Sequence, residues 1–154
     1  MYETVVVPLD GSPLAEQALP HAVALARAFD APLQLVRVFD PMASFAPGAA
    51  SHAAGVASGS LIEETERVER EECERYLAEQ ERELADKGLR VLTTAARGPV
   101  VPTLVDLIQG IASPIVVLTT RGRGGFKRFV LGSVADSLRH QLEVPVTVIP
   151  NTAD

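Results

Sequence analysis

The chain has 154 residues and a formal net charge of −6, with 47% hydrophobic, 22% charged and only 5% aromatic residues. A domain of this size buries enough surface to fold without disulfides or metal ions, and its core must be aliphatic. The acidic balance argues against a general binder of nucleic acid or of anionic membranes. The single cysteine, Cys73, excludes an internal disulfide and a cysteine-based zinc site.

The chain begins directly with a strand-like apolar run at residues 4–9, with no basic segment followed by a long apolar stretch. This pattern does not match a signal peptide, and no apolar run approaches the ~20 residues that a membrane helix needs. The composition is compatible with a reducing compartment. We therefore expect a cytoplasmic protein.

The first helix is expected between the first two strands, at residues 13–29. Ser12 supplies a capping hydroxyl, Pro13 suits the first helical position, and Asp30 with Pro32 ends the helix. Apolar residues recur at helical spacing through this segment: Leu14, Ala18, Ala22, Leu25 and Phe29. The pattern predicts one continuous helix.

Residues 41–60 are rich in Ala, Gly, Ser and Pro and show no period, which predicts a long mobile loop. This loop could close over a ligand or could be a disordered insertion. Residues 61–87 then predict a charged helix whose Glu residues form a solvated face. Its thin apolar stripe consists of Leu61, Thr65, Val68, Tyr76, Leu77 and Leu84. The acidic neighbours of Cys73 disfavour a thiolate, so we do not expect a reactive cysteine.

Five short, mostly continuous apolar runs predict the strands, at residues 4–9, 33–39, 90–95, 115–118 and 144–149. Further helices are predicted at 100–109 and from Ser133 onward. Strands that alternate with helices indicate a parallel sheet with right-handed crossovers. Ligands of such sheets bind beyond the carboxyl ends of the strands, where the strand order reverses. The loops after the first and fourth strands are therefore the candidate site.

The loop after the fourth strand is rich in glycine and basic residues. It reads Thr-Thr-Arg-Gly-Arg-Gly-Gly-Phe-Lys-Arg over residues 119–128, and Gly132 and Ser133 open the following helix. Glycines allow close backbone approach, and free N–H groups at a helix start favour an anion. The basic cluster, at Arg121, Arg123, Lys127 and Arg128, stands out in an acidic chain. The combination favours a phosphate site, although a flexible turn with solvated basic residues is the alternative.

Asp10, in the loop after the first strand, is the second candidate. A carboxylate at this end of a strand could accept hydrogen bonds from ribose hydroxyls or hold a magnesium ion. An Asp-Gly pair also commonly forms a turn in which the Asp side chain bonds its own backbone. The residues alone leave both interpretations open.

The sequence as a whole resembles the universal stress protein family. The opening Val-Val-Pro-Leu-Asp-Gly-Ser at 6–12, the segment 120–134 and the ending Val-Pro-Val-Thr-Val-Ile at 144–149 all look like family signatures. The resemblance extends to element order and length. It implies a single domain over residues 1–154 with a Rossmann-like (HUP-type) α/β fold. That fold is a five-stranded open parallel sheet in the order 3-2-1-4-5, with helices on both faces.

ATP-binding members of the family carry the motif Gly-x2-Gly-x9-Gly-Ser/Thr. Here Gly122 matches the second glycine and Gly132-Ser133 match the end of the motif, whereas Thr119 replaces the first glycine. A threonine brings a Cβ atom and a hydroxyl near the expected path of the ligand. The resemblance therefore implies ATP as the ligand, and Thr119 could either narrow its site or be accommodated there. Asp10 remains the candidate ligand of a Mg²⁺ ion.

The resemblance also assigns roles by position. Pro8 and Val38 would line an adenine pocket, Asp10 would face the ribose, and Leu118 and Thr119 would flank base and sugar. Val134 would close the site. The phosphates would be held by Gly122, Arg123, Gly125, Gly132 and Ser133. The family likeness further implies a homodimer made through the last strand, Val144 to Ile149, and an exposed apolar edge strand does invite association.

Three functions follow as hypotheses. The first is a nucleotide-binding stress or signalling module with ATP as its ligand and at most slow hydrolysis, because no clear base for activating water is visible. The second, favoured by Thr119, is a dimeric interaction or chaperone-like protein that binds no nucleotide. The third is an enzyme such as a nucleotidyl transferase, which the lack of a His-x-Gly-His motif disfavours.

Overall fold

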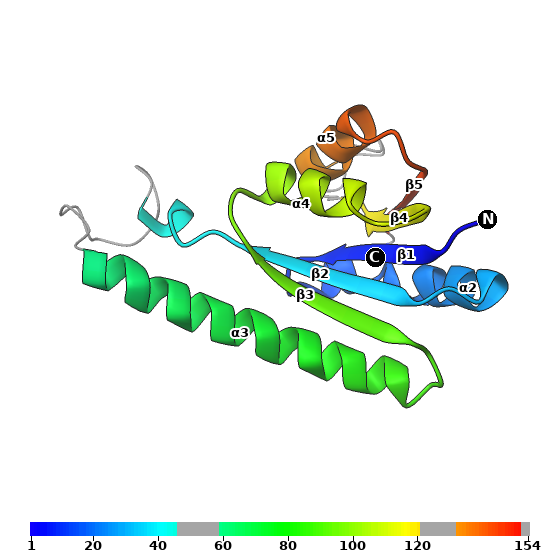
Figure 1. The fold of residues 1–154 in the computed structure, drawn as a ribbon, viewed down its shortest axis with the longest axis horizontal. Coiled ribbons are helices and arrows are strands. Elements are labelled where there is room, and N and C mark those ends of the chain that lie inside the picture. Colours follow the sequence, from blue (N-terminus) through cyan, green and yellow to red (C-terminus); the bar gives the residue numbers. More distant parts are fainter. Residues whose placement is uncertain (46–58, 121–131, 152–154) are drawn as a thin grey trace.

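The computed structural model describes residues 1–45, 59–120 and 132–151. Within them lies one parallel sheet whose strands follow the order β3-β2-β1-β4-β5 (Figure 1). The strands are β1 (Thr4–Leu9), β2 (Leu33–Phe39), β3 (Val91–Arg97), β4 (Pro114–Thr119) and β5 (Val146–Ile149). The predicted fold class and strand order are confirmed. The order reverses between β1 and β4, and sheets of this kind generally bind their ligands beyond the carboxyl ends of the strands at such a reversal.

Helices cover both faces of the sheet (Figure 1). One face is covered by α2 (Leu19–Phe29) and α3 (Gly59–Ala85), and the other by α4 (Val100–Gln109) and α5 (Ser133–Gln141). A short helix, α1 (Pro13–Glu16), follows β1, and a 3-10 turn, η1 (Ala43–Phe45), follows β2. The predicted helix boundaries at 100–109 are confirmed, as is the start of the last helix at Ser133.

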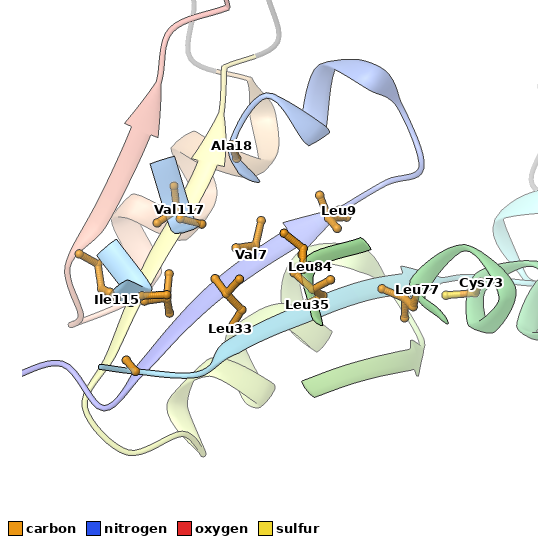
Figure 2. Packing of buried hydrophobic residues seen from close by; sticks show 14 of the residues in the cluster. Val7, Leu9, Ala18, Leu33, Leu35, Cys73, Leu77, Leu84, Ile115 and Val117 are labelled. Carbon is orange, nitrogen blue, oxygen red and sulfur yellow. The ribbon is translucent and has the colours of Figure 1, made fainter. Parts of the chain in front are cut away.

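The core is aliphatic, as the composition predicts, and alternate residues of each strand point to opposite faces. On one face Val7, Leu33 and Leu35 pack with Cys73, Leu77 and Leu84 of α3 (Figure 2). On the other face Val6, Val36 and Val116 pack with Leu104 and Ile108 of α4 and Leu138 of α5. This double coverage explains why the strands read as continuous apolar runs.

The single helix predicted for residues 13–29 is wrong in one respect, because it is broken into α1 and α2. The predicted start is confirmed: Ser12 Oγ accepts a hydrogen bond from the Ala15 backbone amide at 3.2 Å. The break follows from Pro20, which stands in the first turn of α2. Inside one continuous helix, its ring would clash with the carbonyl of Glu16 and its missing N–H would leave that carbonyl unbonded.

The apolar stripe predicted for α3 is buried only in its second half. Cys73, Leu77 and Leu84 are buried, but Leu61 is 43% exposed and Val68 is 49% exposed. Figure 1 shows the reason: the first half of α3 extends past the edge at which β2 ends. From that half, Arg70 reaches over the Phe39 ring at the end of β2, and Glu66 pairs with Arg97 at the end of β3. The prediction that its glutamates are solvated is correct, and Arg67 pairs with Glu64 at 2.7 Å and with Glu71 at 2.8 Å.

The remaining boundaries differ slightly. Pairing between β2 and β3 continues to Phe39↔Arg97, so the third strand runs beyond the predicted Ala95. The last strand begins at Val146 rather than Val144, although the Pro145 carbonyl already accepts a hydrogen bond from the Val116 amide. Of the predicted loop 41–60, residues 43–45 form η1 and residues 59–60 begin α3, while 46–58 lie outside the described residues.

Gly98, at the turn from β3 to α4, is expected to be essential for stability. Its φ of 139° is unfavourable for other residues, and an added Cβ atom would lie 2.6 Å from Thr103 Oγ1. We expect Gly98→Ala to lower the free energy of unfolding by about 2 kcal/mol, measured by chemical denaturation. Gly110→Ala is the control, since its nearest contact would be at 3.5 Å. Equal stability of the two variants would contradict this account.

Candidate functional site

A cavity of ≈310 Å³ opens beyond the carboxyl ends of β1, β2 and β4. It lies at the predicted place, where the strand order reverses. Its walls come from the three strand ends, the loop after β1, and the first turns of α1, α4 and α5. The lining residues are Pro8, Leu9, Asp10, Ser12, Leu14, Ala15, Val36, Val38, Val100, Leu104, Leu118, Thr119, Gly132, Ser133, Val134 and Ala135.

Much of the cavity wall is aliphatic. Val36 and Val38 come from β2, Leu118 from β4 and Leu104 from α4. The pairing of β1 with β2 ends at Leu9↔Arg37, so Val38 extends past the last residue of β1. Such a wall can hold a flat apolar group, and pockets of this kind bind the base or ring of a small molecule.

The polar lining residues are Asp10, Ser12, Thr119 and Ser133. The Asp10 Oδ1 atom accepts hydrogen bonds from the Ser12 backbone amide at 2.9 Å and from Ser12 Oγ at 2.5 Å. The turn interpretation of Asp10 is therefore correct, and the same residue also lines the cavity. The loop bonds hold an exposed carboxylate at the site. Gly11, with φ of 83°, permits the turn between them.

The start of α5 contributes a second feature to the same cavity. Gly132 is its N-cap in an extended conformation, with φ of −61° and ψ of 152°, and has no side chain to bond the first amides. The first turn of a helix carries unbonded N–H groups and the positive end of the helix dipole. Gly132, Ser133 and Val134 all line the cavity, so this helix start could bind an anionic group there.

The structure thus brings together most of the predicted site. Eight of the predicted residues line this one cavity: Pro8, Asp10, Val38, Leu118, Thr119, Gly132, Ser133 and Val134. Three others, Gly122, Arg123 and Gly125, lie outside the described residues, as does the basic cluster at 121–128. Thr119, which departs from the family motif, ends β4 and is half-buried in the cavity wall.

Several lining residues were not predicted from the sequence, among them Val36, Leu104 and Ala135. Leu104 and Ala135 are apolar positions of helices that pack on the sheet, and Val36 belongs to the core of β2. Their residue types do not distinguish them from core residues. The one sequence-level sign of a cavity beside them is the predicted reversal of strand order between β1 and β4.

Metal binding by side chains alone finds little support in the part of the chain that the structure describes. No group of three or more His, Cys, Asp or Glu side chains there could hold a metal ion. Asp10 is the one carboxylate among the cavity-lining residues. Since Mg²⁺ is commonly held by one or two carboxylates together with substrate phosphates, Asp10 could serve only with a phosphorylated ligand.

Cys73 is expected to be unreactive in the folded protein. Its side chain is 1% exposed, and burial raises the pKa of its thiol despite the opposing effect of Arg37. Because the thiolate is the nucleophile, we expect a thiol reagent at pH 8 to modify Cys73 only in denaturant. A colorimetric thiol assay with and without denaturant measures this, and rapid labelling of the native protein would contradict it.

The family model for the universal stress protein family matches residues 1–150. The chain belongs to the universal stress protein family. A universal stress protein of Methanocaldococcus jannaschii is 28% identical over 149 residues, covering 97% of this chain and 82% of that protein. One of Mycobacterium bovis is 30% identical over 159 residues, covering 95% of this chain and 47% of its own length. The chain therefore spans about half of that mycobacterial relative.

Solved structures of the family share the fold. A universal stress protein in complex with cAMP has a TM-score of 0.66 at 21% identity, covering 98% of both chains. An Arabidopsis thaliana family member with AMP bound also has 0.66, at 15% identity, covering 98% of this chain and 93% of that one. An Archaeoglobus fulgidus member in complex with dAMP has 0.58, at 17% identity, covering 97% and 98%. Within the described residues of our chain, no helix is long and apolar enough to span a membrane.

Proposed function

We propose that this universal stress protein binds an adenine nucleotide, with ATP as the favoured ligand, in the cavity beyond β1 and β4. One observation carries the proposal: an aliphatic wall, an exposed carboxylate and an open helix start line the same ≈310 Å³ space. These suit, in turn, a base, a ribose and a phosphate. The AMP, cAMP and dAMP complexes of structural relatives support this ligand class.

In this proposal the base lies between Pro8, Val38 and Leu118. Asp10 accepts hydrogen bonds from the ribose hydroxyls. The phosphates lie at the start of α5, against Gly132 and Ser133, and Gly122, Arg123 and Gly125 complete their site. A magnesium ion would be held chiefly by the phosphates, with Asp10 as the protein ligand.

The same site offers little for catalysis. Among the described histidines, His21 and His140 are exposed and neither lines the cavity. The lining residues supply positioning but no evident base to activate a water molecule, so any hydrolysis of ATP would be slow. The protein would act through ligand-dependent binding to a partner rather than through turnover.

Thr119 favours a second candidate, a dimeric interaction or chaperone-like protein without nucleotide. Its side chain stands in the cavity wall, where the family motif has glycine. The nucleotide content of the purified protein distinguishes the two candidates, by denaturation and ion-exchange chromatography of the supernatant. Adenine nucleotide released in proportion to protein supports the first. If none is released and none binds at about millimolar concentration, any binding free energy is weaker than about −4 kcal/mol and the second candidate is favoured.

We also propose a homodimer through residues 144–149. The Pro145 and Ile149 carbonyls accept hydrogen bonds from Val116 and Thr120 on the β4 side. Alternation along a strand then turns the backbone of Val148 to the outer edge. We expect Val148→Pro to weaken dimerisation about tenfold in analytical ultracentrifugation, because it removes one edge donor. Thr147→Ala is the control, and a monomeric wild-type protein would refute the dimer.

A further inference from the structure

A groove lies on the far side of the loop that carries Asp10. We call it the α3 groove; its volume is ≈460 Å³. Asp10 and Ser12 line both the cavity and this groove, so their loop is the wall between the two. A side chain that supports the wall from the groove side therefore affects how Asp10 is presented to the cavity. The full lining is Asp10, Gly11, Ser12, Arg37, Glu72, Arg75, Tyr76 and Glu79.

Arg37 supports the wall most directly. It is paired with Leu9 in the register of β1 and β2, beside the strand that leads into the loop. Its side chain is only 18% exposed. A Cβ atom at Gly11 would lie 3.1 Å from Arg37 Cζ and 3.1 Å from Nη2, so the guanidinium lies close against the loop backbone.

The guanidinium is itself held by α3. Arg37 Cζ lies 5.1 Å from the centroid of the Tyr76 ring, a cation–π distance, and Arg37 Nη2 lies 3.2 Å from Glu72 Oε1. The Tyr76 hydroxyl donates a hydrogen bond to Glu16 Oε1 at 2.9 Å. Burial and this bond raise the pKa of Tyr76, so the hydroxyl remains a donor at neutral pH. The chain of contacts thus joins α1, α3 and β2 around the loop.

We propose that Arg37, held by Tyr76 and Glu72, is a positioning residue for Asp10 and thereby determines how strongly the site prefers a ribose with free hydroxyls. The inference rests on the proposed function, because it takes Asp10 as the group that faces the ribose. Arg37 does not line the cavity and is not expected to touch the nucleotide. Its effect must therefore pass through Asp10.

The test compares the dissociation constants for ATP and for 2′,3′-dideoxy-ATP, by calorimetry on the full chain. The variants are Arg37→Met, Asp10→Ala and the two combined. Tyr76→Leu is added because it removes the ring that holds the Arg37 guanidinium. Arg70→Met is a matched control, because Arg70 lies 5.2 Å over the Phe39 ring and 2.6 Å from Glu66 but does not line the groove. Thermal unfolding verifies that each variant is folded.

We expect the wild type to prefer ATP, and Arg37→Met and Tyr76→Leu to reduce that preference about three- to tenfold. The preference of Arg70→Met should match the wild type, and the double variant should bind no worse than Asp10→Ala alone. If Arg37→Met lost the same factor of affinity for both nucleotides, or if the affinity losses of the two substitutions added up in the double variant, the inference would be overturned. A wild type that binds neither nucleotide would instead refute the proposed function, and the inference with it.

Discussion

Asp10→Ala is expected to weaken the binding of ATP about ten- to a hundredfold, the usual effect of losing hydrogen bonds to a charged group. In the proposed site this carboxylate accepts hydrogen bonds from the ribose hydroxyls. Alanine cannot replace them, and the fold should survive because Asp10 is exposed at the end of β1. Calorimetric titration of the variant beside the wild type measures the change in dissociation constant.

The control for this prediction is Asp10→Asn. The Asp10 side chain also bonds the Ser12 amide and hydroxyl, so alanine removes loop contacts as well as the proposed ligand contact. Asparagine keeps an acceptor oxygen for Ser12 and should give an intermediate affinity. If Asp10→Ala binds ATP as tightly as the wild type, the ribose assignment is wrong.

Val38→Trp is expected to reduce ATP binding by more than about a hundredfold, because a side chain that occupies a pocket excludes its ligand. Val38 lines the cavity at the end of β2, and a tryptophan there would fill much of the ≈310 Å³ space. The substitution enlarges a half-buried residue beside open space, so the core should tolerate it. Binding is measured by calorimetry and folding by circular dichroism.

Leu92→Trp is the matched control for this substitution. Leu92 belongs to β3, where it pairs with Gln34 of β2; it is 54% exposed and does not line the cavity. The Leu92→Trp variant should bind ATP as tightly as the wild type. Tight binding by Val38→Trp would place the ligand elsewhere on the protein.

The fold could be predicted from the sequence because the central strands β1, β2 and β4 are largely buried on both faces and read as apolar runs. What the sequence did not predict depends on distances between elements. The stripe of α3 looks uniform, yet Leu61 and Val68 are exposed because the helix extends past the sheet. The broken first helix was predictable in principle, since Pro20 alone accounts for it.

In the candidate site, the charged, polar and glycine residues of the loops could be identified from the sequence, whereas several aliphatic residues could not. Asp10, Gly132 and Ser133 follow from the loops after β1 and β4, and all three line the cavity. Leu104 could not be assigned, because an apolar residue of a helix looks the same whether it faces the sheet or a cavity. Arg37 was equally hidden, because its neighbours Gly11 and Tyr76 come from distant segments of the chain.

The central claim, that the cavity binds an adenine nucleotide despite Thr119, is tested most directly by calorimetric titration of the wild-type protein with Mg-ATP. We expect one site per chain with a dissociation constant of about 1 μM, which corresponds to about −8 kcal/mol of binding free energy. No heat of binding at millimolar ATP, for protein verified to be free of co-purified nucleotide, would contradict it.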